Sequence, residues 1–202
     1  EGKSAKIEKI NINGYEIFTS EEILRGFELS EGSFFSFLSN DDQYSREKLK
    51  GDIETLESYY RDRGYLKFSI ESSQISLSRD KREIYITFNV NEGQKYTIKD
   101  VEVVGEIPFE EEIYINITDS LKEQTYSQAT ITGIEEFFTN VLGNRGYAFA
   151  EVKGNPEVED ESNEVKLTFT IEPGKRTYTR KILFTGNEIT QDHVLRREMR
   201  QF

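Results

Sequence analysis

The sequence predicts an α+β protein made of two tandem repeats and the beginning of a third. The stretch "EGQKYTIKDVEVVGE" (92–106) has a counterpart at the start of the chain and another near its end, so that Gly2, Gly93 and Gly174 mark equivalent points of successive units. Each copy reads as a turn, an alternating apolar run and a second turn, which is typical of a strand at the joint between repeat units.

A long helix is predicted in each unit by a second pair of matching stretches. "YSREKLKGDIETLESYYRDRGY", from Tyr44, aligns without gaps with "YSQATITGIEEFFTNVLGNRGY", from Tyr126. Ser45 and Ser127 stand at the expected N-caps, and each stretch ends in Arg-Gly-Tyr, whose glycine suits the left-handed position after a helix. The apolar positions between them share one face, as in a helix that covers a sheet.

Each long helix also contains an internal glycine at the same place, Gly51 or Gly133. Such a glycine costs about 1 kcal/mol relative to alanine. We therefore expect another element, such as the sheet, to approach the helix closely there.

A short helix and a hairpin complete each unit. Thr19 and Glu22 form a predicted capping box at the start of the first short helix. After each Arg-Gly-Tyr, two alternating segments separated by "RDK" or "DES" predict a hairpin. The order is β-α-α-β-β, with two helices packed on a three-stranded mixed sheet. The first strand can pair in parallel with the last, because a helical crossover separates them, and the second strand is left at an edge.

The first unit is longer than the second because of an aromatic loop, "EGSFFSFLSNDDQY". Its large apolar residues are Phe34, Phe35, Phe37 and Leu38. They either form an exposed patch that binds other chains or pack over the helix ends, and we favour the packing role.

Composition limits the possible functions. The net charge of −12 argues against nucleic acid, which proteins bind through Lys and Arg. The chain has no cysteine and a single histidine, His193, so we expect no catalytic site, metal site or cofactor. No apolar run approaches the ~20 residues that a membrane helix needs. Since the first residues already match the joint between units, we expect the chain to begin inside a larger protein.

The β-α-α-β-β unit, with its glycine after the first strand and its Arg-Gly-Tyr, resembles the POTRA domain. "IETLESYYRDRGY", "QISLS", "YTRKI" and "VLRREMRQ" are similar to the third, fourth and opening fifth POTRA domains of the BamA family of outer-membrane assembly factors. The resemblance implies domains at 1–92 and 93–173 and a truncated one at 174–202. A departure is "GEIPFEEEIYINITDSLKEQ", which lacks the asparagine that usually follows the strand-ending glycine.

The resemblance also implies a function. The chain is identified as part of a periplasmic arm that binds unfolded outer-membrane protein chains by strand addition and scaffolds accessory lipoproteins, without enzymatic activity. The alternative is the POTRA region of a two-partner secretion pore, which recognises one dedicated exoprotein. In either case Gly93 and Gly174 are the predicted hinges between units.

The second strand of the first unit is the main candidate site. Phe68 and Ile70 fall on even positions but Ile75 and Leu77 on odd ones, so the alternation slips across 71–74, which predicts a bulge if both pairs face the core. Unpaired backbone groups at an edge let another extended chain add to the sheet. The alternative is that the bulge only protects this edge from aggregation. The candidate residues are Lys67, Phe68, Ile70, Glu71, Gln74, Ile75 and Leu77. The resemblance implies that a BamB-like lipoprotein contacts Lys67, Glu71 and Ile75.

A second candidate is "VLRREMRQ" on the first helix of the truncated unit. Its charged residues are Arg196, Arg197, Glu198 and Arg200. On pattern alone they form the solvated face of a short helix. The resemblance implies that they dock a BamD-like lipoprotein, with Glu198 in an ion pair.

Overall fold

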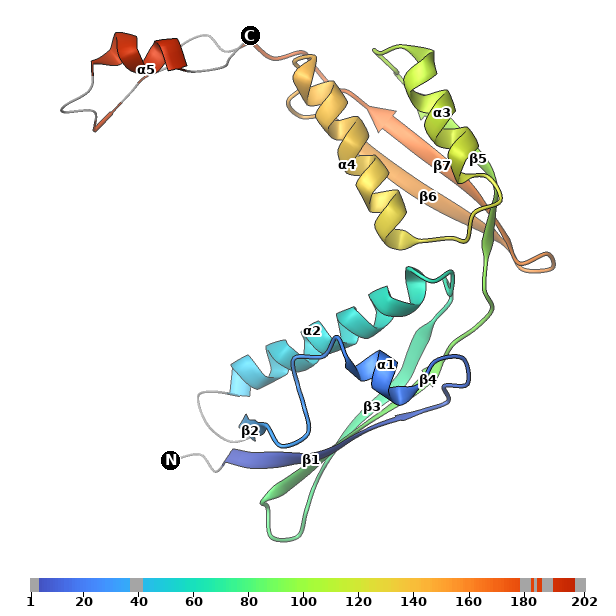
Figure 1. Ribbon diagram of the computed structural model, residues 1–202, viewed down its shortest axis with the longest axis vertical. Coiled ribbons are helices and arrows are strands. Elements are labelled where there is room, and N and C mark those ends of the chain that lie inside the picture. The colour runs from blue at the N-terminus through green and yellow to red at the C-terminus, as the bar shows by residue number, and fades with distance from the viewer. Residues whose placement is uncertain (1–3, 37–41, 179–182, 184, 187–190, 199–202) are drawn as a thin grey trace.

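Two units of sheet and helices lie end to end in the computed structural model, which describes residues 4–36, 42–178, 183, 185–186 and 191–198 (Figure 1). The first unit contains β1 (Ser4–Asn13), α1 (Ser20–Leu24), β2 (Phe34–Ser36), α2 (Asp42–Arg61), β3 (Ser69–Leu77) and β4 (Glu83–Asn91). The second contains β5 (Thr97–Gly105), α3 (Glu111–Leu121), α4 (Gln128–Asn144), β6 (Glu151–Glu159) and β7 (Glu164–Glu172), and α5 (Asp192–Glu198) follows. In these ranges the structure contains no helix with the length and apolar character needed to cross a membrane.

Both sheets have the predicted mixed topology. The strand orders are β2-β1-β4-β3 and β5-β7-β6. The first long strand runs parallel to the last in each unit, β1 with β4 and β5 with β7, and the hairpins β3–β4 and β6–β7 are antiparallel. The helices of each unit lie on one face of its sheet (Figure 1). The prediction of a β-α-α-β-β unit is confirmed.

The aromatic loop adds a short fourth strand to the first sheet, which the sequence did not predict. β2 pairs antiparallel with the start of β1, with Phe35 opposite Ala5. Pairing of this kind gives the loop backbone hydrogen-bond partners that it would otherwise have to find in water. Phe37 and Leu38 lie outside the described residues.

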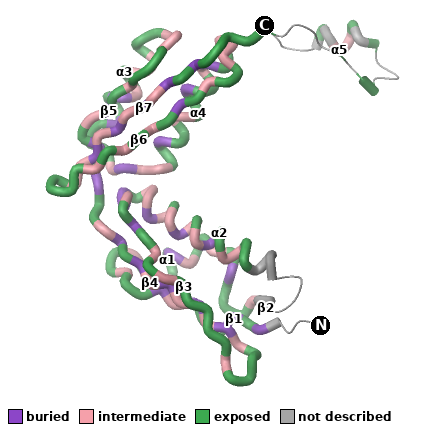
Figure 2. The backbone as a smooth tube through the Cα atoms, turned by 180° about the vertical axis from the view of Figure 1, so that it is seen from behind, coloured by how far each residue is buried: buried purple, intermediate pink, exposed green. Residues whose placement is uncertain are grey.

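Each unit has its own core, as the two separate groups of buried residues in Figure 2 show. The inward residues of the central strand alternate with solvent-facing ones, Ile84, Ile86, Phe88 and Val90 in β4 and Val165, Leu167, Phe169 and Ile171 in β7. From the long helices, Leu56 and Tyr60 complete the first core, and Ile131, Phe138 and Leu142 the second. This burial supplies the main driving force for folding of each unit.

The predicted helix caps are confirmed at two of three positions. Thr19 and Glu22 form the capping box, and the Ser127 hydroxyl accepts the N–H of Thr130 at 3.3 Å. At Ser45 the prediction is wrong, because α2 already begins at Asp42. The two residues between them, Gln43 and Tyr44, contain no helix breaker, so the helix extends past the serine.

The expectation for the mid-helix glycines is also wrong. Gly51 and Gly133 are exposed, and a methyl group added to either would meet no atom within 4 Å. The close approach of helix and sheet occurs at Gly154 in β6, where an added Cβ would lie 2.7 Å from Ile131 Cγ2 of α4. The glycine that the packing requires is therefore in the strand.

A buried carboxylate holds the longer loop of the first unit. Asp52 of α2 is 1 % exposed and accepts the N–H groups of Glu28 and Leu29 at 2.7 and 3.0 Å. Burial raises the pKa of Asp52, against the opposing effect of these two hydrogen bonds. When the long helices are aligned, Asp52 corresponds to Ile134, in the unit that has the shorter loop. The carboxylate thus replaces part of the apolar face where a loop must be anchored.

We predict opposite effects for two glycine-to-alanine changes in the second unit. Gly105 has φ +108°, and a Cβ there would lie 2.1 Å from the carbonyl oxygen of Ile171. Gly105→Ala is therefore expected to lower the free energy of unfolding by about 1–3 kcal/mol or more. Gly133→Ala adds a better helix former in open space and is expected to raise it by about 1 kcal/mol. Urea unfolding followed by circular dichroism measures both, and equal effects of the two changes would contradict this account.

Candidate functional site

β3 is the edge strand on the hairpin side of the first sheet, and it carries the predicted bulge. Its pairing with β4 is regular from Ser72 to Leu77, but the register shifts between Ile70 and Ser72, so that Glu71 is the extra residue. The shift puts Ile70 opposite Val90 and Ile75 opposite Ile86, so both lie on the core side of the sheet. The prediction that the slip reflects a bulge is therefore confirmed.

The backbone of β3 presents a row of hydrogen-bonding groups to its free side. The N–H of Ser78, just beyond the strand, donates to Glu83 O at 2.9 Å and therefore points inward. Because the direction alternates along a strand, the N–H and C=O groups of Ser73, Ile75 and Leu77 point outward. No strand in the described part of the chain pairs with this side of β3.

The side chains next to this row are apolar on one face and polar on the other. Ile75 is 37 % exposed and Leu77 42 % exposed, although the residues opposite them in β4 are fully buried. The helices thus cover β4 but leave the outer edge of the apolar face open. On the other face, Ser72 Oγ accepts a hydrogen bond from Asn89 Nδ2 at 2.7 Å, and Gln74 is exposed.

The remaining predicted residues of this strand have different roles. Phe68 is buried and stacks on Tyr60 with ring centroids 4.0 Å apart, so it belongs to the core. Ile70 is half-buried, whereas Glu71 is exposed at the bulge. Lys67 lies before the strand and forms an ion pair with Asp160 of the second unit. Within the candidate set, Glu71, Gln74, Ile75 and Leu77 are the residues accessible at the edge.

A buried glutamate, which sequence reasoning missed, lies beside the bulged end of β3. Glu92 is 6 % exposed and accepts hydrogen bonds from Tyr60 Oη at 2.7 Å and from the N–H of Glu16 at 2.9 Å. Burial and the contact with Glu92 raise the pKa of the Tyr60 hydroxyl, so it remains a donor. A pocket of about 460 Å³ lies here, lined by Glu92, Glu71 and Lys95 among others. One difference between the units could have pointed to Glu92 in the sequence. The residue before the joint glycine is a glutamate in the first unit and Pro173 in the second.

The joint between the units is held by contacts that sequence reasoning also missed. Asp62, after the end of α2, accepts the N–H of Ala129 at 2.8 Å and so satisfies a donor at the start of α4. The Lys67–Asp160 ion pair is joined by the Tyr96 hydroxyl, which donates to Asp160 at 3.0 Å. The hydrogen bonds from Lys67 and Tyr96 keep the pKa of Asp160 below its usual value. These pairs lie far apart in the sequence, and nothing in their local pattern marks them.

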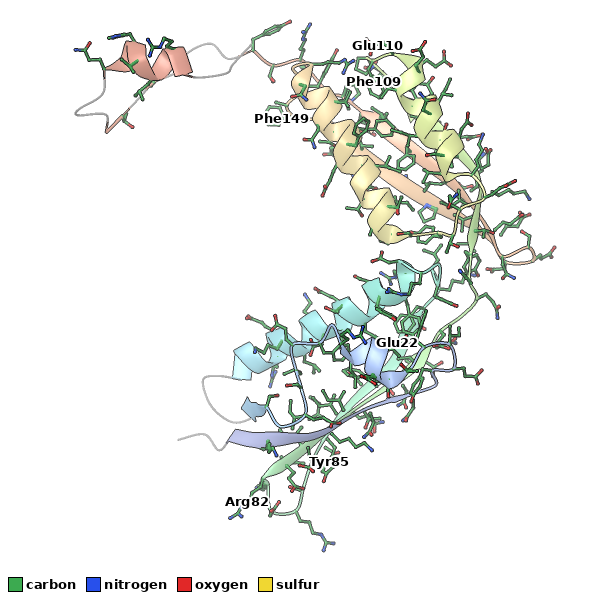
Figure 3. The ribbon with its side chains drawn as sticks, in the orientation of Figure 1. Glu22, Arg82, Tyr85, Phe109, Glu110 and Phe149 are labelled. Atoms are coloured by element: carbon green, nitrogen blue, oxygen red, sulfur yellow. The ribbon has the colours of Figure 1, made fainter. Side chains whose placement is uncertain are left out.

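The predicted hinge glycines have the same conformation but different surroundings. Gly93 and Gly174 have φ of +69° and +66°. A backbone hydrogen bond spans each joint. Tyr96 N–H donates to Gly64 O at 2.9 Å, and Thr177 N–H donates to Gly146 O at 2.7 Å. Counted from Arg-Gly-Tyr, the place of Lys67 is taken in the second unit by Phe149, which is 77 % exposed (Figure 3). The ion pair of the first joint therefore has no counterpart at Phe149.

The second predicted site is described only in part. Arg196, Arg197 and Glu198 lie in α5, and of their side chains the structure describes that of Arg197, which is exposed. Arg200 lies outside the described residues.

Comparison with a family model places both units in one family of repeats. The POTRA model, described as a surface antigen variable number repeat, matches residues 5–93 and again residues 96–174.

Curated relatives and solved structures are similar over the whole chain. The outer membrane protein assembly factor BamA of Buchnera aphidicola is 33 % identical over 201 residues, and that of Neisseria meningitidis is 30 % identical over 202 residues. These alignments cover all of this chain but 33 % and 25 % of those proteins, so the chain spans a third or less of their length. A crystal structure of Haemophilus influenzae BamA POTRA3-5 matches with a TM-score of 0.82 at 26 % identity, over 100 % of this chain and 79 % of that one.

We predict that the exposed apolar residues of β3 contribute little to stability. Ile75→Thr/Leu77→Thr is expected to lower the free energy of unfolding by about 1–2 kcal/mol in total, because both side chains are already partly in water. The matched control Ile84→Ala, at a fully buried position in the neighbouring strand, is expected to cost about 2–5 kcal/mol. Urea unfolding compares them, and a double variant as unstable as the control would show that Ile75 and Leu77 are core residues.

We also predict that the joint loosens when its side-chain contacts are removed. Asp62→Ala/Lys67→Ala leaves an N–H of α4 without its acceptor and breaks the ion pair to Asp160, so the angle between the units is expected to vary more widely. Small-angle X-ray scattering and residual dipolar couplings measure that angle.

The control for the joint is Glu54→Ala, since the ion pair of Glu54 with Lys50 stays within α2. If the double variant and the control both scatter like the unaltered chain, the backbone alone sets the angle and the side-chain contacts do not.

Proposed function

Because the chain belongs to the POTRA family, we propose that it forms the periplasmic arm of an outer-membrane protein assembly factor and binds client chains by adding them as a strand to β3. The family is not enzymatic, and membership in it supports a role as a binding module. Similarity to BamA proteins over the whole chain favours an assembly factor over a two-partner secretion pore.

The observation that carries this proposal is the free side of β3. Three residues with outward backbone groups, Ser73, Ile75 and Leu77, offer hydrogen bonds that do not depend on the sequence of the incoming chain. Such bonds suit a protein that must bind many different unfolded chains. Specificity then comes from the pattern of side chains and not from their identity.

The two faces of β3 define the pattern of a suitable client. An incoming strand would place alternate residues beside Ile75 and Leu77 on the apolar face, and the others beside Ser72 and Gln74 on the polar face. Strands of membrane β-barrels alternate between apolar and polar residues in this way. Added apolar residues would cover Ile75 and Leu77, which gives a favourable burial term besides the backbone bonds.

Accessory lipoproteins are the second class of partner that we propose. A BamB-like protein would contact the first repeat at Lys67, Glu71 and Ile75. Because Lys67 is already paired with Asp160, such a partner either joins that ion pair or replaces Asp160 in it. A BamD-like protein would dock on α5 and the residues after it, through Arg196, Arg197, Glu198 and Arg200.

For the predicted hinge at Gly93, the structure identifies the contacts that movement would have to break. Movement about Gly93 requires the Asp62–Ala129 and Lys67–Asp160 contacts to open. We propose that repositioning of clients by the arm is limited by these contacts.

We predict that a short synthetic peptide of alternating valine and threonine shifts the amide NMR signals of Ser69–Leu77. Ile75→Pro should weaken this binding roughly tenfold or more, because proline removes one outward N–H and its ring obstructs the edge. The change should be compatible with the fold, since the second unit has Pro156 at the corresponding place in β6. Heteronuclear NMR titration gives the affinity.

The control for this experiment is Ile75→Thr, which keeps the N–H group and loses only apolar contact. Strand addition predicts that Ile75→Thr weakens binding less than Ile75→Pro does. Signal changes spread over the helices, with β3 unaffected, would refute binding at the edge.

A further inference from the structure

β6 occupies the same edge position in the second unit as β3 does in the first. Judged by their partners in the central strands, Gly154 of β6 corresponds to Ser73 of β3, and Pro156 corresponds to Ile75. If strand addition depended only on topology, both edges would accept a client. The two edges differ, however, in the groups that face outward.

The outward N–H groups in the middle of β6 are removed or occupied. Gly154 N–H donates to the Glu135 carboxylate of α4 at 2.6 Å, which shows that it points away from β7. Pro156 has the same orientation two residues later and has no N–H. The outward N–H groups that remain are those of Val152 and Val158, which are separated by about 20 Å at ~3.3 Å per residue.

The position of α4 makes this arrangement possible. An added Cβ at Gly154 would lie 2.7 Å from Ile131 Cγ2 and 3.3 Å from Glu135 Oε1, so the helix lies directly against the strand. In the first unit, the residue that aligns with Glu135 is the half-buried Ile53, which packs on the core. Ser73 also carries a side chain where Gly154 has none. The helix of the first unit therefore supplies no carboxylate to its edge at Ile53.

We propose that Glu135 and Pro156 close the β6 edge of the second repeat to strand addition, so that of the two equivalent edges, β3 and β6, only β3 pairs with clients. The Glu135 carboxylate acts in place of the carbonyl of an incoming strand, through a short, charge-assisted and partly buried bond. A client would have to displace this carboxylate and would still find no donor at Pro156. This inference rests on the proposed strand addition at β3.

The test removes the two features of β6 that we propose to block pairing. Glu135→Ala/Pro156→Ile frees the Gly154 N–H and restores a donor at 156, so that β6 presents the same outward groups as β3. We expect the alternating valine–threonine peptide to shift β6 amide signals in this variant, with a dissociation constant within about tenfold of that at β3. In the unaltered protein, β6 should stay unchanged at concentrations that saturate β3.

The matched control is Glu135→Gln/Pro156→Ile. The glutamine keeps a side-chain oxygen that can accept the Gly154 N–H, so binding at β6 should stay at least about tenfold weaker than in the alanine variant. Equal binding by the two variants would show that Pro156 alone closes the edge and would overturn the role of Glu135.

The outcomes separate this inference from the proposed function. Peptide binding at β6 of the unaltered protein, or no binding at β6 of the opened variant, overturns the inference. Binding at the opened β6 without binding at β3 upholds the closure of β6 by Glu135 and Pro156 and refutes the proposed function.

Hydrogen exchange of the unaltered protein tests the same point without substitutions. The Gly154 amide should be protected, whereas the outward amides of Ser73, Ile75 and Leu77 should exchange rapidly. Equally rapid exchange at Gly154 would also overturn the inference.

Discussion

Unpaired backbone groups at the edge of a sheet are the constraint on which this structure depends. Three long strands and two helices bury one core, but the edge strand of each hairpin, β3 or β6, must leave alternate N–H and C=O groups outside the ladder. In β3 these groups are left to solvent. In β6 a carboxylate and a proline remove two donors. The same fold therefore leaves the outward N–H groups of β3 free and removes two of them in β6.

The two units use different polar anchors on the same framework. Asp52 holds the longer loop of the first unit, where the second unit has Ile134. Glu92 fixes the turn after β1 through the N–H of Glu16, where the second unit has Pro173. A buried carboxylate is stable only when hydrogen bonds compensate for its desolvation, and both carboxylates have at least two such bonds. Each anchor therefore appears where the backbone supplies donors.

The periodicity of apolar residues predicted most of the fold because the chain contains two copies of the repeat, which could be compared. The parallel pairing of β1 with β4, the edge position of β3 and a bulge within 71–74 all follow from alternation and connection length, and the structure places the bulge at Glu71. The residues that were missed act across long sequence distances. Asp62 caps a helix of the next unit, and no local pattern distinguishes it from other helix-end acids. Glu135 was closer to being predictable, since an acid at a spacing of four from Ile131 interrupts an otherwise apolar face.

The joint and the candidate edge are physically continuous. Lys67 lies two residues before β3, and its ion pair with Asp160 links the start of this strand to the β6–β7 hairpin of the second unit. Phe68 follows directly and is stacked in the first core, so the chain between joint and edge is held at both residues. The direction of β3 relative to the second unit is thus set by side-chain contacts and by the Tyr96–Gly64 backbone bond. With this joint, β3 presents its free side in a defined direction relative to the second unit, which would lower the entropy cost of the proposed strand addition.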